Sequence, residues 1–550
     1  MLYEIVMSVN SWREDAIEKL KSEEFDLVVI GGGINGAGIA RDAALRGLKV
    51  ALIEKDDFAE GTSSRSSKLV HGGLRYLKYY EFKLVREATT ERKTLMNIAG
   101  HNVHRLPFLV PIFKWSKEGK FLLMMGLTLY DILSLPKGIG WHKMLDREKI
   151  VEKEPVLETE ELVSGAMYYD CQMDDARLCV ENVVSAVRFG AVALNHCEAI
   201  DFLHDEDGNV NGVIAKEKFT GEKIEIHGKV VINTGGPWAD KIRNLTGKNV
   251  KRLRTTKGVH LIVPKMLNDN AVILFLKDGR AVFLIPWHNY TMIGTTDTDY
   301  NDKPELVSVD AEDVRYLVEN IKDAFPKFNI KYEDIISAYA GLRPLVRQEG
   351  KSESEVSREH RIFEDEDGLI TLIGGKYTTY RTMAKELVDL AVKRLGYKGK
   401  RYQCITDKVP LVGGNFENLD ELKQKIKERS GLEDKYVEHL ANSYGAEALK
   451  LILYAKAKDL SLEPIDIDFP FLWAEIDWTI REEFACKLKD FMWRRTYFAL
   501  TPGQGIQVAD KIAKRMAEVL GWDDERIKKE IEEYKQTLEL VNKWKKEMDI

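Results

Sequence analysis

Apolar and polar positions near the N-terminus follow the pattern of a strand, a helix and a second strand. An apolar run at 27–30 enters a glycine-rich turn at 31–36, a helix rich in small residues follows, and a second apolar run ends at residue 53. Short apolar runs bounded by glycine are typical of buried parallel strands. Residues 25–57 are therefore predicted to form one βαβ unit.

The turn carries the spacing G-x-G-x-x-G of a dinucleotide-binding site. Gly31 permits a tight turn, Gly33 lets the backbone approach a pyrophosphate, and Gly36 lets the helix pack closely on the strand. Free N–H groups at the helix start attract the anion. Glu54 follows about 20 residues later, where a carboxylate accepts hydrogen bonds from a ribose diol. We expect a dinucleotide site here; a purely structural glycine turn is the alternative.

Later parts of the chain predict further strands and then helices. Two more apolar strands, at 229–232 and 369–373, also run into glycine turns, and a helix is expected at 379–395. The other predicted elements are a strand and helix at 162–193, a β meander at 199–231, antiparallel strands at 259–263, 281–285 and 291–294, and amphipathic helices at 419–429, 437–453, 482–492 and 524–548.

These patterns predict an α/β protein, α+β overall, with three kinds of domain. They are a Rossmann-like dinucleotide-binding domain, an antiparallel-sheet substrate domain and a mainly helical C-terminal domain. The expected boundaries are 1–24 for an N-terminal extension, 25–100, 162–260 and 340–400 for the dinucleotide-binding domain, 101–161 and 261–339 for the substrate domain, and 408–550 for the helical domain.

Composition narrows the classes of partner. The chain of 550 residues has a net charge of -7, which argues against nucleic acid as a partner because phosphate backbones are bound by clustered Lys and Arg. The five cysteines form no C-x-x-C pair, so we expect a reducing compartment and no metal site. No signal peptide or transmembrane span is expected; the apolar run at 121–135 carries Asp131 and is interpreted as a buried or amphipathic helix, with contact to lipid or quinone as the alternative.

Longer motifs carry a resemblance to a known family. TSSRSSKLVHGGLRYL, INTGGPWAD, TKGVHLIVP, AGLRPL and GGKYTTYR occur in that order, and MWRRT lies in the tail. With these motifs the chain resembles FAD-dependent glycerol-3-phosphate dehydrogenases, flavoproteins of the D-amino-acid oxidase and glycine oxidase type. The resemblance covers nearly the whole length. It implies an FAD-dependent enzyme that oxidises sn-glycerol 3-phosphate to dihydroxyacetone phosphate by hydride transfer from C2 to flavin N5, passes electrons to a quinone, and lies peripherally on the cytoplasmic face of the membrane.

The resemblance also implies which residues contact the substrate. They are Arg75, Tyr76, Arg343, Arg358 and Lys376. Guanidinium groups suit a phosphate dianion because they bind its oxygens bidentately. Lys376 is expected near the flavin or the substrate, with a solvated loop lysine as the alternative.

Oxidation at C2 also needs an acceptor for the hydroxyl proton. Histidine is the usual acceptor near neutral pH, and His71 and His260 are the candidates, each with a structural role as the alternative. Arg343 could instead polarise the hydroxyl. The residues expected to bind the cofactor are Gly31, Gly33, Gly36, Glu54, Thr62, Ser63, Ser64, Ser67, Lys68, Gly235, Gly375, Lys376 and Thr378.

Several other functions stay open at this point. An oxidase of the same family would reduce oxygen to hydrogen peroxide, and a non-catalytic FAD-binding subunit would keep the cofactor motifs alone. The glycine motif by itself also fits an NAD-dependent dehydrogenase. An iron–sulfur relay is not expected, because the tail beyond Cys404 contains only Cys486. The electron acceptor, quinone or another, and a homo-oligomeric state are left open by the sequence.

Overall fold

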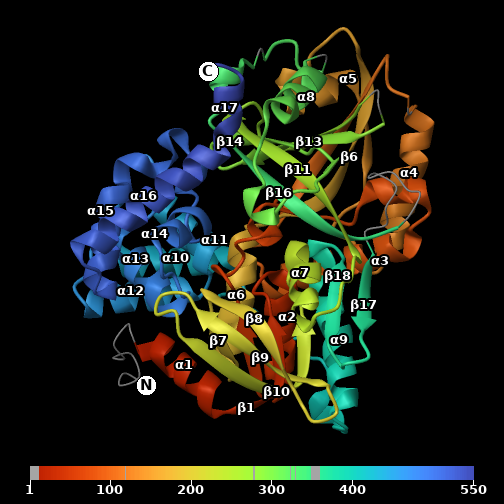
Figure 1. Ribbon diagram of the computed structural model, residues 1–550. Helices are drawn as coiled ribbons and strands as arrows, with labels where there is room; N and C mark the ends of the chain where they lie inside the picture. The colour runs from red at the N-terminus through yellow and green to blue at the C-terminus, as the bar shows by residue number, and fades with distance from the viewer. Residues whose placement is uncertain (1–10, 118, 277–278, 323, 329, 349–358) are drawn as a thin grey trace.

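The computed structural model describes residues 11–117, 119–276, 279–322, 324–328, 330–348 and 359–550. Two β-sheets lie one above the other in Figure 1, and the helical C-terminal part, coloured cyan to blue, lies beside both. The α/β class with a Rossmann-like domain, an antiparallel sheet and a helical tail is confirmed.

The first sheet is built around β1 (Glu24–Ile30). Its parallel neighbours are β2 (Val50–Ile53) and β10 (Lys223–Asn233), and the parallel series continues to β7 (Val192–Leu194) on one side and β18 (Ile370–Gly374) on the other. The predicted βαβ unit is thus present, and the three strands expected to end in glycine turns lie side by side.

Antiparallel strands extend this sheet. The predicted meander is formed by β8 (Cys197–His204), β9 (Val210–Glu217) and β10, and β17 (His360–Glu364) pairs with β18 at the edge. Both turns of the meander contain a glycine in the left-handed region, Gly208 at φ +83° and Gly221 at φ +78°.

Helices cover both faces of the first sheet. On one face lie α2 (Ile34–Leu45), α6 (Asp175–Arg188) and α9 (Tyr380–Arg394), and on the other lie α1 (Ser11–Ser22) and the meander. The side chains of β1 alternate between these two cores and are all buried from Phe25 onward, which explains the continuous apolar run.

The second sheet is mainly antiparallel and is covered by other helices. Its long strands pair as β11 (Leu253–Pro264) with β16 (Ser337–Val346) and as β4 (His104–Phe113) with β6 (Leu162–Gln172). The other strands are β3 (Leu69–Val70), β5 (Lys143–Asp146), β12 (Ala271–Phe275), β13 (Ala281–Trp287), β14 (Tyr290–Gly294) and β15 (Thr298–Asp299). The helices are α3 (Phe82–Ile98) and α4 (Lys120–Ser134) on one face and α5 (Arg147–Lys153) and α8 (Ala311–Ile321) on the other.

Strands of the second sheet occur in all three predicted segments of the dinucleotide-binding domain. β3 falls within 25–100, β6 and most of β11 fall within 162–260, and most of β16 falls within 340–400. Each strand pairs over nearly its whole length with a second-sheet neighbour, a long-range pairing that local sequence pattern does not encode.

The C-terminal part is helical, as predicted, but two of its helices differ from the prediction. Its helices are α10 (Leu419–Ser430), α11 (Asp434–Tyr444), α12 (Glu447–Ala457), α13 (Trp473–Glu482), α14 (Leu488–Asp490), α15 (Ile506–Leu520), α16 (Asp524–Val541) and α17 (Lys543–Glu547). The helix expected at 437–453 is split at Gly445, where a Cβ would lie 2.1 Å from the carbonyl oxygen of Gly413. The prediction of a helix at 482–492 was also wrong. α13 ends at Glu482 and Phe484 adopts φ +62°. The chain then forms α14 and a π-helical turn, Phe491–Arg495.

Candidate active site

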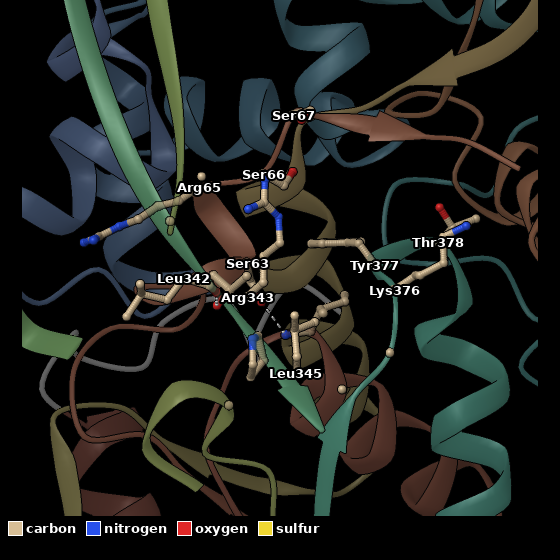
Figure 2. A pocket seen from close by; sticks show the side chains of 18 of the residues that line it. Ser63, Arg65, Ser66, Ser67, Leu342, Arg343, Leu345, Lys376, Tyr377 and Thr378 are labelled. Carbon is tan, nitrogen blue, oxygen red and sulfur yellow. Dashed lines mark hydrogen bonds between the residues drawn. The ribbon is translucent and has the colours of Figure 1, made fainter. Parts of the chain in front are cut away.

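A cavity of about 1520 Å³ extends between the two sheets. Its lining includes the glycine turns after β1, β10 and β18, the loop after β2, and strands β11 and β16. Figure 2 shows Ser63, Ser66 and Ser67 of this loop in the same pocket as Arg343 of β16 and Lys376 after β18. The cavity therefore joins motifs that are separated by hundreds of residues in the sequence.

The glycine turn after β1 has no space for a side chain at Gly31 or Gly36. Gly31 has φ +105°, and a Cβ on Gly36 would lie 1.9 Å from the carbonyl oxygen of Gly31. Gly33 is the N-cap of α2 and lines the cavity. Ser63 accepts a hydrogen bond from the amide of Ile34 at 2.9 Å. The start of α2 thus offers an anion site to the cavity.

Glu54 lies at the end of β2 on the cavity wall. Its carboxylate accepts hydrogen bonds from the amide of Gly32 at 2.7 Å and from the amide of Asp56 at 2.9 Å. Burial, together with the nearby charge of Asp56, raises the pKa of Glu54 to about 7. A diol that donates to this carboxylate would favour its charged form, as expected for a ribose-binding acid.

The loop after β2 places some of its predicted residues in the cavity and others outside it. Thr62, Ser63 and Ser67 line the cavity, and Thr62 donates to the carbonyl of Leu342 at 2.6 Å. Ser64 and Lys68 do not line it. Lys68 is buried and its Nζ lies 2.5 Å from Asp175, so its contact with a cofactor stays a prediction.

The other two glycine turns reach the cavity as expected. Gly235 and Gly375 line it, and a Cβ on Gly375 would lie 2.2 Å from Sδ of Met383. Thr378 also lines the cavity, and its hydroxyl lies 3.3 Å from both the amide nitrogen and the carbonyl oxygen of His71. The third turn therefore fixes the segment that carries the histidine.

Cationic side chains gather at the end of the cavity near this histidine. Nζ of Lys376 lies 4.4 Å from the ring centre of Tyr76, and the guanidinium of Arg75 lies 5.5 Å from the same ring. Among the described residues, none hydrogen-bonds the buried Nζ of Lys376. Burial lowers the pKa of Lys376, and so does Arg75. A buried ammonium without such a bond is costly, so this end of the cavity favours an anionic ligand.

Arg343 approaches from β16 and is held by three oxygen atoms. Its guanidinium lies 3.1 Å from Asp297, 3.0 Å from Oγ1 of Thr295 and 3.1 Å from the carbonyl of Thr296. On the neighbouring strand β11 a Cβ at Gly258 would lie 2.3 Å from the guanidinium, which explains the glycine there. Arg358, the other predicted arginine, lies outside the described residues.

Both candidate histidines line the cavity. Burial lowers the pKa of His71 well below its usual value, and Lys376 and Arg75 lower it further. Burial, together with Arg343, lowers the pKa of His260 to about 3. His260 stacks on Tyr339 with ring centres 5.0 Å apart, and its Nε2 lies 2.8 Å from Oγ of Ser67. Both pKa shifts favour the neutral imidazole, which is a weaker base than an exposed histidine.

Sequence reasoning missed several residues of the cavity. Arg65 and Ser66 line it from within the TSSRSS motif, which was itself the available signal. Asp297 and Thr295 orient Arg343 and lie in IGTTDTDY, a segment that also matches the family but to whose residues no role was assigned.

The mouth of the cavity is apolar. Tyr79, Tyr80 and Phe82 near the start of α3 and Leu122 and Met125 of α4 line it and are exposed. In the described part of the chain no helix combines the length and apolar character needed to cross a bilayer. The helix predicted at 121–135 is α4, amphipathic, with one face buried and the other open.

Comparisons with known proteins agree over nearly the whole chain. The family model for FAD dependent oxidoreductase matches residues 26–390, and that for the C-terminal domain of alpha-glycerophosphate oxidase matches residues 404–527. The aerobic glycerol-3-phosphate dehydrogenase of Staphylococcus haemolyticus is 40% identical over 536 residues, covering 94% of this chain and 95% of the relative.

Two solved structures are similar to this chain over much of its length. The glycerol-3-phosphate dehydrogenase from Bacillus halodurans, complexed with FAD, is 32% identical with a TM-score of 0.79 and covers 97% of this chain and 98% of that one. Glycine oxidase from Geobacillus kaustophilus, at 19% identity and a TM-score of 0.53, covers 69% of this chain and 96% of that one and shares the fold.

Proposed function

The chain belongs to the family of FAD-dependent oxidoreductases and within it to the aerobic glycerol-3-phosphate dehydrogenases, and from this premise we propose that it oxidises sn-glycerol 3-phosphate to dihydroxyacetone phosphate with FAD as its cofactor. The observation that carries the proposal is the meeting of three glycine turns and a cluster of buried and half-buried cations in one cavity. The first suits a dinucleotide and the second a phosphate dianion.

The residues at the nucleotide end fit FAD. Gly31 and Gly33 line the cavity at the start of α2, and Gly36 has no room for a Cβ against the carbonyl of Gly31, which keeps the helix close to the turn. We propose that Glu54 binds the ribose, and that the loop residues Thr62, Ser63 and Ser67 with the turns at Gly235, Gly375 and Thr378 hold the rest of the cofactor. When bound, FAD supplies the acceptor for the hydride.

At the opposite end we propose that the protein binds and orients the substrate. Arg75, Lys376 and Arg343 hold the phosphate and the C2 hydroxyl, Tyr76 packs beside them, and Arg358 is a further phosphate ligand. The dianion would offset the positive field that lowers the pKa of His71, so His71 becomes a better proton acceptor once substrate is bound. His260 is the second candidate for this role, and Arg343 polarises the hydroxyl.

We further propose that electrons leave to a quinone at a lipid surface. The open face of α4 supports this: Phe121 is 69% exposed and Leu122 59%, next to Tyr80 at 80%. Lys83 and Arg86 of α3 are also exposed, which suits anionic headgroups. Co-sedimentation with anionic vesicles tests it. Binding by the natural protein that Phe121→Glu abolishes supports it, and sedimentation of neither protein contradicts it.

An assay of substrate-dependent dye reduction, with chemical detection of dihydroxyacetone phosphate, tests the function itself. sn-Glycerol 3-phosphate should reduce the dye and glycerol should not, because glycerol lacks the phosphate. Equal rates with both would contradict the proposed phosphate site. The match of residues 404–527 to an oxidase domain favours one second candidate, a glycerol-3-phosphate oxidase. Fast stopped-flow reoxidation by oxygen but not by a quinone analogue would establish that alternative.

A further inference from the structure

The helical C-terminal part contacts the loop between Glu54 and Ser63 at a buried set of charges. Asp57, fully buried in this loop, receives two hydrogen bonds from Arg495, at 2.8 and 3.0 Å, and one from Arg494 at 2.6 Å. Both arginines belong to the π-helical turn Phe491–Arg495. Arg494 also pairs with Glu60, and Lys489 lies 3.4 Å from Glu60.

The same loop is fastened to the glycine turn on its other side. The amide of Ala59 donates to the carbonyl of Gly32 at 3.1 Å, and a Cβ on Gly32 would lie 2.5 Å from the ring of Phe58. Gly32 in turn donates to Glu54. A shift of this loop would therefore disturb the contacts of the glycine turn and, through Gly32, those of Glu54.

Phe484 of the helical part and Asn195 also contact this loop. Phe484 adopts φ +62°, a strained conformation for a bulky residue, and its ring meets Phe58 edge to face at 5.5 Å. Asn195 donates to Asp57 at 3.0 Å and to the carbonyl of Phe484 at 2.8 Å. The surroundings that hold this conformation include Phe58 of the loop, Asn195 and Trp12 of α1.

We propose that Arg494 and Arg495 are positioning residues for the adenosine half of the cofactor: through Asp57 and Glu60 they fix the loop that presents Glu54 and Ser63. Neither arginine lines the cavity. A guanidinium fork is suited to this because a bidentate pair defines the orientation of its partner as well as its distance. The C-terminal part thus contributes to cofactor affinity across the interface. This inference rests on the proposed FAD site.

The test compares two variants at the same interface. Arg495→Lys keeps the charge but loses the bidentate contact with Asp57 and the fork that also binds the carbonyl of Glu483. Arg177→Lys is the matched control, because Arg177 makes a buried bidentate pair with the carboxylate of the same Glu483, at 2.7 and 3.2 Å, that joins α6 and not the loop to the helical part. Holoproteins are diluted and ultrafiltered, and the free FAD is measured by its fluorescence.

We expect the Kd of FAD to rise on the order of tenfold for Arg495→Lys, as when residues that orient a ligand-binding group are replaced, and to stay near the natural value for Arg177→Lys. Turnover at saturating FAD should be nearly equal in both. An equal rise in both variants, or none in either, would overturn the inference. If Arg495→Lys does not fold, Asp57→Asn carries the same test from the loop side. A natural protein that binds no FAD would contradict the proposed function instead.

Discussion

The two ends of the cavity differ in how their charged groups are paired. At the nucleotide end the charges have partners: Glu54 accepts two amide hydrogen bonds, and Asp57 and Glu60 pair with arginines. At the substrate end Lys376 is buried with no hydrogen bond in the described part of the chain. The charged groups of the nucleotide end are therefore paired within the protein. At the substrate end Arg343 is paired with Asp297, whereas the buried ammonium of Lys376 is held at a cost that an anionic ligand would relieve. Substitutions at the two ends should accordingly separate cofactor retention from catalysis.

The largest effect is expected at the nucleotide end. Gly36→Ala would place a Cβ 1.9 Å from the carbonyl of Gly31, so strand and helix must separate where the pyrophosphate is proposed to bind. We predict protein purified without flavin and without activity, measured by absorbance and dye reduction. Gly126→Ala is the control, because its Cβ would meet nothing within 4 Å. A yellow, active Gly36→Ala protein would show that the nucleotide site is misplaced.

At the substrate end, Arg343→Ala should lower kcat/KM sharply while bound FAD stays in place. Losing a charged contact in a desolvated site weakens transition-state stabilisation by roughly 2 to 5 kcal/mol. Steady-state kinetics of the preparation measure catalysis, and its flavin content measures how much FAD is retained. Unchanged kinetics would show that the substrate pocket lies elsewhere.

Lys376→Met should separate stability from binding. Because the ammonium is buried without a hydrogen bond, its removal should leave the free energy of unfolding of the substrate-free protein unchanged or raise it by about 1 kcal/mol. The same change should raise KM for sn-glycerol 3-phosphate. Denaturant unfolding and kinetics test both; a large loss of stability would show that Lys376 is a structural cation.

The effect with the least consequence at neutral pH is a pH dependence of stability. The folded-state pKa of His260, lowered by burial to about 3, lies below that of an unfolded histidine. Between these two values the unfolded chain binds the extra proton, so stability falls as pH drops, by at most roughly 1.4 kcal/mol per pH unit. His260→Gln should flatten this part of the unfolding curve. An unchanged slope would show that folding does not lower the pKa of His260.

Sequence patterns predicted those parts of the site that depend on backbone geometry. Gly31, Gly36 and Gly375 follow from local rules, because a missing Cβ leaves a recognisable spacing next to an apolar strand. Pairings between residues that are far apart in the sequence produce no such local pattern. Lys68 and Lys376 both lie in motifs, yet one is paired with Asp175 and the other is not. The break at Phe484 likewise depends on a contact with Phe58, more than four hundred residues earlier in the chain.

The most direct test of the central claim is the absorbance spectrum of the purified protein under anaerobic conditions, before and after sn-glycerol 3-phosphate is added. The account predicts a flavin spectrum that bleaches with substrate in the natural protein, and the same spectrum with greatly slowed bleaching in Arg343→Ala. A protein without flavin, or a flavin that sn-glycerol 3-phosphate leaves oxidised in the natural protein, would contradict it.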